Sequence, residues 1–214
     1  KGIWTAVITP FNDDLSIDYG SFAGMVSSQL EAGVQGLVIA GTTGESPTLS
    51  IQDKLSLIKK AKVLSGGKLQ IMAGTGGSCT DQCVELAKLC IEAGANSLLV
   101  VTPPYNKPNT SGMFGHFNKL SQASTVPICL YHVPSRTAQH LSCDEIVSIC
   151  ELPNVSMIKE ASSNLNFLSQ LVQNSTASIL TGDDPTFLPS LAVGGCGAIS
   201  VVSNIFPKAM VQLQ

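Results

Sequence analysis

The sequence has few charges and no excess of basic ones. Only 13% of its 214 residues are charged and 44% are hydrophobic, a composition typical of a folded globular chain without a disordered tail. The formal net charge of −3 disfavours nucleic acid and acidic membrane surfaces as partners. No apolar run approaches the roughly 18 residues of a membrane span. No charged-then-apolar signal peptide opens the chain either. We therefore expect no nucleic-acid partner and no membrane partner.

The sequence also lacks metal-binding motifs. Its seven cysteines contain no Cys-x-x-Cys pair, and its three histidines lie on no His-Glu-x-x-His motif, so no metal site is expected. An odd number of cysteines without such a pair fits a reducing compartment, and we expect a cytoplasmic protein. Cys83 and Cys90 are seven residues apart, which is the spacing of small core residues on one helix face.

Short apolar runs alternate with segments of helical period along the whole chain. The eight expected strands are Thr5–Pro10, Gly36–Gly41, Gln70–Gly74, Ser97–Pro103, Pro127–Val133, Val155–Glu160, Ala177–Gly182 and Gly197–Ser203. The expected helices are Tyr19–Ala32, Ile51–Leu64, Thr80–Ala93, Ser111–Ser124, Ser142–Glu151, Asn164–Gln173 and Pro185–Val193. Eight such repeats predict an α/β fold, a (β/α)₈ TIM barrel forming one domain over residues 1–214. A doubly wound sheet is the alternative, but no Gly-x-Gly-x-x-Gly follows the first strand.

Local signals mark the ends of several expected helices. The start signals are the capping boxes Ser50-x-x-Asp53 and Ser142-x-x-Glu145 and the pair Asp184-Pro185, read as an N-cap followed by proline. Gly33 and Gly94 are the corresponding stop signals. The segment Phe206–Gln214 begins a helix after the eighth strand and then stops.

Lys159 ends the sixth apolar run and is the leading catalytic candidate. Alternation along a strand places Lys159 on one face and Glu160 on the other. If Lys159 faces a core, loss of hydration lowers the pKa of its amine, and a free amine is a Schiff-base nucleophile toward a ketone. The structural alternative is a strand-end lysine that reaches water or pairs with Glu160.

Polar side chains collect after strands two, four and five, at the rim where barrel enzymes hold their sites. They are Thr42, Thr43, Tyr105, Tyr131 and Arg136. Tyr131 is placed one strand from the lysine, where it can move protons, and Thr42 can link it to Tyr105. Thr43 and Arg136 are candidate carboxylate sites. Taken singly, the threonines also fit a tight turn, Tyr131 fits strand packing, and Arg136 fits an exposed loop.

Three other features are interpreted as structural. Asp183-Asp184 resembles a paired acid and base, but Asp184 before Pro185 is typical of a helix cap. Gly74–Gly77 lacks the lysine of a phosphate loop, so the expected substrate is a carboxylate without phosphate. His132 follows Tyr131 and is expected on the opposite face of its strand.

Four motifs at these strand ends are Gly41-Thr-Thr-Gly-Glu-Ser46, Thr102-Pro-Pro-Tyr-Asn-Lys-Pro108, Tyr131-His-Val-Pro-Ser-Arg-Thr137 and Ile158-Lys-Glu-Ala161. In them the sequence resembles the dihydrodipicolinate synthase family, within the N-acetylneuraminate lyase superfamily of pyruvate-dependent Schiff-base aldolases. The resemblance implies a lyase of lysine biosynthesis that condenses pyruvate with aspartate semialdehyde. It implies no cofactor, because pyruvate forms a covalent imine with Lys159. It also implies a homo-oligomer, either a dimer or a tetramer.

The resemblance also implies a role for each site residue. Lys159 forms the imine; Tyr131, Thr42 and Tyr105 relay protons, with Tyr105 reaching the neighbouring subunit's site. Thr43 binds the pyruvate carboxylate and Arg136 that of the semialdehyde. Gly182 and Ile199 line the site through their backbones.

Some positions depart from the family pattern. His132 stands where the family usually has asparagine, and Pro104 where lysine-inhibited bacterial members carry tyrosine. In those members lysine binds a feedback site, and Ile51 and Lys54 replace polar or histidine residues that line it. We therefore expect weak or absent inhibition by lysine. The family's C-terminal helical region does not follow in this sequence. Two alternative functions remain: an aldolase for a sugar acid such as N-acetylneuraminate or 2-keto-3-deoxygluconate, and a non-catalytic barrel that binds pyruvate.

Overall fold

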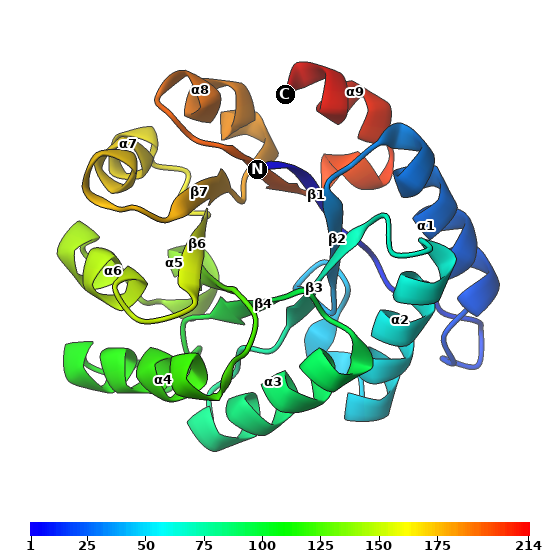
Figure 1. Ribbon diagram of the computed structural model, residues 1–214, viewed down its shortest axis with the longest axis horizontal. Helices are drawn as coiled ribbons and strands as arrows, with labels where there is room; N and C mark the ends of the chain where they lie inside the picture. Colours follow the sequence, from blue (N-terminus) through cyan, green and yellow to red (C-terminus); the bar gives the residue numbers. More distant parts are fainter.

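The computed structural model describes residues 1–214 and shows a closed barrel of eight parallel strands surrounded by helices (Figure 1). The strands are β1 (Gly2–Ala6), β2 (Gly36–Ile39), β3 (Gln70–Gly74), β4 (Ser97–Val101), β5 (Ile128–His132), β6 (Val155–Glu160), β7 (Ser178–Thr181) and β8 (Gly197–Ser200). Pairing of β1 with β8 closes the ring. The predicted (β/α)₈ barrel is confirmed.

Helices lie on the outside of the ring, and all but the last, α9, stand between successive strands in the chain. They are α1 (Tyr19–Ala32), α2 (Ile51–Leu64), α3 (Thr80–Ala93), α4 (Thr110–Ala123), α5 (Pro134–Thr137), α6 (Cys143–Cys150), α7 (Leu165–Asn174), α8 (Phe187–Ala192) and α9 (Pro207–Leu213). Short 3₁₀ turns are η1 (Ser46–Thr48), η2 (Asp184–Thr186) and η3 (Val202–Asn204). None of the helices combines the length and the apolar character needed to cross a membrane.

The first and last strands differ most from the predicted ranges. β1 begins at Gly2, three residues before the predicted start, and ends at Ala6. Its first residue pairs with Gly197, where a Cβ atom would lie 2.1 Å from the Gly2 carbonyl oxygen, so the closing strands need glycine at this contact. Glycine has a low strand propensity, so the sequence does not indicate that β1 begins at Gly2. β8 ends at Ser200, because the backbone then turns into η3.

Most helix-end signals are confirmed. Both capping boxes form, with Ser50 and Ser142 accepting from the backbone of the third helical residue, and Gly33 and Gly94 adopt the left-handed conformation. The cap assigned to Asp184 is wrong. Its Oδ2 atom instead accepts hydrogen bonds from the backbone N–H groups of Val201 and Val202, both at 3.0 Å, which follow the end of β8.

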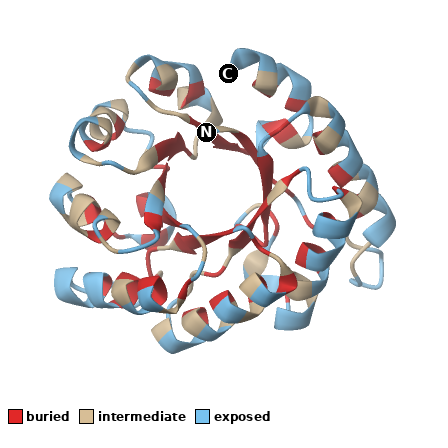
Figure 2. Cartoon of the chain, viewed as in Figure 1, coloured by how far each residue is buried: buried red, intermediate tan, exposed pale blue.

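The barrel has two separate hydrophobic cores. The larger core contains 38 residues and lies between the strands and the helices, and it includes Cys83 and Cys90 as predicted. The smaller core contains 11 residues inside the ring. Figure 2 shows the same division, with buried residues along the strands and inner helix faces and exposed residues on the outer helix faces. Side chains that alternate along one strand therefore enter different cores, which decides which residues reach the barrel mouth.

Candidate active site

Lys159 lies on the inner face of β6 and is 6% exposed. Its neighbour Ile158 packs in the outer core, whereas Met157 packs against the inner one, as alternation requires. Burial lowers the pKa of the Lys159 amine from 10.5 to about 8; the carboxylates of Asp183 and Asp184 oppose this shift. An amine with this pKa is available as a nucleophile near neutral pH.

Tyr131 is the closest aromatic partner of that amine. β5 and β6 pair in register with Tyr131 opposite Lys159, and the lysine Nζ atom lies 4.2 Å from the centre of the tyrosine ring. Burial raises the pKa of the Tyr131 phenol, and a hydrogen bond with Thr42 and the charge of Arg136 both act to lower it. The structure therefore brings together Lys159, Tyr131 and Thr42, three of the four predicted catalytic residues.

Gly182, directly after β7, borders the lysine, and Ile199 lies in β8. A Cβ atom at position 182 would lie 2.7 Å from Lys159 Cε, so the lysine side chain occupies the space that only glycine leaves free. Ile199 is fully buried in the inner core. Neither residue lines the cavity described next.

A cavity of about 370 Å³ opens over the ends of β2 to β5. Tyr131, Thr42 and Arg136 line it; Lys159 does not, although it contacts Tyr131. The cavity wall carries two cationic side chains, Arg136 and Lys54, and no carboxylate, so it favours an anionic ligand. Thr43 is half-buried in the loop after β2 and does not line the cavity.

Tyr105 is the predicted site residue that the structure does not bring to its own barrel mouth. Its side chain is 95% exposed and its φ of 72° places the backbone in the left-handed region. The turn is held against the β3–α3 loop, because Ser78 donates to the Pro104 carbonyl at 2.8 Å and Asn106 donates to the Ser78 carbonyl at 3.0 Å. These contacts direct Tyr105 away from the chain.

Sequence reasoning missed part of the cavity wall. Gly74, Gly76 and Gly77, interpreted above as structural, line it together with Ser46, Pro47 and Lys54, of which only Lys54 was assigned a role, at the expected lysine-feedback site. A Cβ atom at Gly74 would lie 2.1 Å from the Ala40 carbonyl oxygen, and one at Gly76 would lie 2.4 Å from the Val101 nitrogen. These glycines permit close backbone contacts between neighbouring loops, a reason that the linear sequence does not display.

His132 and Glu160 point outward, as predicted for residues next to Tyr131 and Lys159. The His132 ring nitrogen Nδ1 lies 2.7 Å from Glu160 Oε2, and Lys159 therefore makes no pair with Glu160. No group of three or more histidine, cysteine, aspartate or glutamate side chains is arranged to hold a metal ion.

Comparisons with known proteins point to one family. A family model described as the dihydrodipicolinate synthetase family matches residues 1–214. The 4-hydroxy-tetrahydrodipicolinate synthase of Magnetococcus marinus is 40% identical over 97% of this chain and 72% of its own length. The enzyme of the same name from Methanocaldococcus jannaschii is 40% identical over 100% of this chain and 74% of its own.

Solved structures show the same relationship. A dihydrodipicolinate synthase crystal structure superposes with a TM-score of 0.96 at 40% identity, covering 99% of this chain and 74% of that one. The dihydrodipicolinate synthase of Acinetobacter baumannii, solved in complex with pyruvate, gives a TM-score of 0.97 at 36% identity, with 99% and 74% covered. Both sequence and fold match over nearly the whole chain. The chain therefore belongs to the dihydrodipicolinate synthetase family.

Proposed function

We propose that the chain condenses pyruvate with L-aspartate 4-semialdehyde to give 4-hydroxy-tetrahydrodipicolinate, in the diaminopimelate route to lysine. The observation that carries this proposal is the buried Lys159 amine, with a pKa of about 8, beside the Tyr131 ring. At pH 7 about a tenth of such an amine is unprotonated, against less than a thousandth at the ordinary pKa of lysine. The name shared by the 40% identical relatives supports this choice of substrates.

The first half-reaction builds an imine on Lys159. The free amine attacks the ketone carbon of pyruvate, a C–N bond forms, and the carbonyl oxygen leaves as water after two proton transfers. Tyr131 supplies and accepts these protons, and Thr42 connects it to Tyr105 of a neighbouring subunit. Thr43 binds the pyruvate carboxylate. The imine on Lys159 is the electron sink, so the reaction needs no separate cofactor.

The second half-reaction forms the carbon–carbon bond. Loss of a methyl proton converts the imine into an enamine, whose carbon attacks the aldehyde carbon of the semialdehyde. The amino group of that substrate then attacks the imine carbon, closes the ring and releases Lys159. Arg136 binds the semialdehyde carboxylate, and the backbones of Gly182 and Ile199 line the site.

The quaternary structure is part of the proposal. A homo-oligomer, dimer or tetramer, explains why Tyr105 is 95% exposed in the single chain, since it then completes a neighbouring site. The partners are otherwise the small-molecule substrates. Cytoplasmic location and the absence of nucleic-acid and membrane partners stay predictions from composition.

A substrate panel tests the proposed function. Purified protein is assayed with pyruvate and the semialdehyde, and separately for cleavage of N-acetylneuraminate and 2-keto-3-deoxygluconate. We expect turnover of the first pair only. Cleavage of a sugar acid without turnover of the semialdehyde would favour the alternative aldolase, and pyruvate binding without any turnover would favour the non-catalytic barrel.

Arg136 provides the matched variant for this panel. Loss of a charge-assisted, two-pronged carboxylate contact in Arg136→Gln should raise the KM for the semialdehyde by about tenfold to a hundredfold. Imine formation with pyruvate should change much less than the KM for the semialdehyde, because Thr43 is assigned to the pyruvate carboxylate and Arg136 acts on Lys159 and Tyr131 only through its charge. The control is Lys119→Gln, which removes an exposed cation paired with Asp81 on the helix surface.

A further inference from the structure

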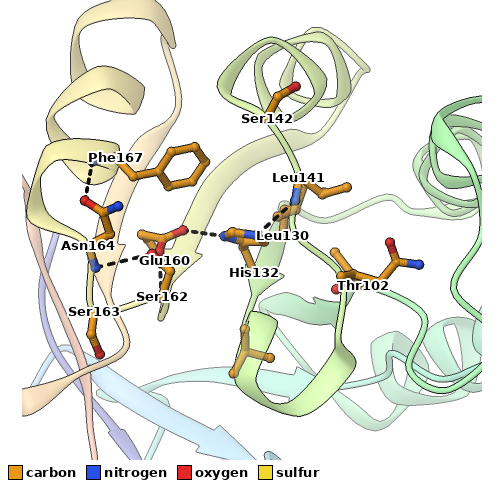
Figure 3. A network of polar contacts seen from close by, with 12 residues as sticks. Thr102, Leu130, His132, Leu141, Ser142, Glu160, Ser162, Ser163, Asn164 and Phe167 are labelled. Atoms are coloured by element: carbon orange, nitrogen blue, oxygen red, sulfur yellow. Dashed lines mark hydrogen bonds and ion pairs between the residues drawn. The ribbon is translucent and has the colours of Figure 1, made fainter.

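Two outward-facing residues lie directly behind the proposed reactive pair. β5 and β6 pair Tyr131 with Lys159 and, one residue later, His132 with Glu160. Because side chains alternate along a strand, each residue of the outer pair adjoins one of the inner pair in sequence. His132 and Glu160 are each 2% exposed, and Figure 3 shows them between the sheet and Phe167 of α7.

The hydrogen bonds of the pair fix the state of the histidine. Leu141 donates its backbone N–H to His132 Nε2 at 3.3 Å, so Nε2 is an unprotonated acceptor. Nδ1 then carries the proton and donates to Glu160 Oε2 at 2.7 Å (Figure 3). An imidazolium would place two N–H groups against each other at Nε2. The geometry therefore selects the neutral histidine protonated on Nδ1.

The second carboxylate oxygen holds the turn that follows Lys159. Glu160 Oε1 accepts from the backbone N–H of Ser162 at 2.6 Å, and the Ala161 N–H donates to the His132 carbonyl at 2.9 Å. Ala161 in turn packs in the inner core, and its Cβ borders Gly182 together with the Lys159 stem. A shift of this turn would move the wall against which the lysine side chain lies.

We propose that His132 and Glu160 are positioning residues that hold the ends of β5 and β6 so that Tyr131 and Lys159 face each other. This inference rests on the proposed function. The pair connects four segments, namely β5, β6, the α5–α6 connection at Leu141 and the turn at Ser162. A buried hydrogen-bonded carboxylate adds less net stability than apolar packing, because removing its charge from water has a large free-energy cost. Since Glu160 is next to Lys159 in the chain, we interpret its hydrogen bonds as contacts that position the reactive residues.

The test is the isosteric variant Glu160→Gln in the full chain. The glutamine oxygen can accept from His132 or from Ser162 but not from both, and its amide NH₂ group faces the other donor. We expect kcat to fall by about tenfold to a hundredfold, as for a misplacement of about 1 Å, while the KM for pyruvate changes little. The control is Glu145→Gln, which loses a carboxylate that accepts from Ser142 and Thr110 at the start of α6, away from the mouth. Its kcat should stay unchanged.

Two measurements separate this inference from the proposed function, because neither needs turnover. The pKa of the Lys159 amine is followed by competitive acylation and peptide mass. It should move in Glu160→Gln back toward 10.5, because a displaced lysine side chain loses the burial that lowers its pKa, and it should not move in Glu145→Gln. Nitrogen chemical shifts of labelled His132 should show a proton on Nδ1 alone. An unshifted amine pKa in Glu160→Gln, or an imidazolium at His132, would overturn the inference even if the wild type is fully active. A wild type that forms no imine would instead overturn the proposed function.

Discussion

Gly182 lies so close to Lys159 that an added methyl group has no room. A Cβ atom there would be 2.7 Å from Lys159 Cε and 2.7 Å from the Ala161 Cβ. Gly182→Ala should displace the lysine stem, lower turnover by more than tenfold, and reduce the free energy of unfolding by about 1–3 kcal/mol through overpacking. Steady-state kinetics and urea denaturation measure the two effects.

The control is Gly24→Ala on the exposed face of α1, where an added Cβ has no atom within 4 Å. That change should stabilise the protein by about 0.5–1 kcal/mol and leave turnover unchanged. Wild-type turnover in Gly182→Ala would show that Lys159 does not need its present position.

Single residues of the site were predictable where the reason is local. Alternation in Val155–Glu160 indicates that Lys159 and Glu160 face opposite ways, and the structure confirms it. The depth of burial that lowers the pKa of Lys159 was not predictable, because it depends on Tyr131 in β5 and on Gly182 directly after β7. The same holds for Lys54, whose place in the cavity wall depends on how α2 packs.

At the scale of the elements, hydrogen bonds join η2 to the residues that follow β8. The Asp184 carboxylate accepts from two consecutive backbone N–H groups, at Val201 and Val202. Asp184 also raises the pKa of Lys159 through its charge. The Asp184 carboxylate therefore has two effects: it holds the backbone after β8 by hydrogen bonds, and it raises the pKa of the Lys159 amine.

Asp184→Ala should accordingly have two effects. Losing both hydrogen bonds should reduce the free energy of unfolding by about 1–3 kcal/mol. Removing the negative charge should lower the pKa of the Lys159 amine below about 8, so the rise of imine formation with pH should move to lower pH. A pH series of pyruvate trapping measures the shift, and a shift toward higher pH would contradict the assigned charge effect.

The ends of elements were predictable where a side chain caps its own helix. They were not predictable where the hydrogen-bond partner of that side chain is distant in the sequence. The capping boxes at Ser50 and Ser142 place the starts of α2 and α6 correctly. Asp184 has the same local appearance, yet its partners lie 17 and 18 residues away. The short helix α5 was missed for a similar reason, since four residues after a proline give too little periodic signal.

At the scale of the whole molecule, the cavity that Tyr131 and Arg136 line also includes Lys54 of α2. Lys54 and Pro104 both line this cavity, and burial lowers the pKa of the Lys54 amine. Ile51 is exposed on the same helix. An ammonium ligand would meet like charge there and no carboxylate. Turnover should therefore be insensitive to lysine at millimolar concentration, and an inhibition constant in the micromolar range would refute this.

Subunit complementation tests the proposed role of Tyr105. Lys159→Arg and Tyr105→Phe should each be nearly inactive as homo-oligomers. When the two variants are refolded together, mixed oligomers contain sites with an intact lysine and an intact tyrosine from the neighbouring subunit, and activity should return. No recovery in oligomers shown to be mixed would mean that Tyr105 acts within its own chain or not at all.

The most direct test of the central claim is reduction with borohydride in the presence of pyruvate, followed by peptide mass analysis. The wild type should carry one reduced pyruvate adduct, located on Lys159, and Lys159→Arg should carry none while keeping its fold. The arginine keeps the positive charge but is not a nucleophile. An adduct on another lysine, or a wild type without any adduct, would contradict the assignment of Lys159 as the imine-forming residue.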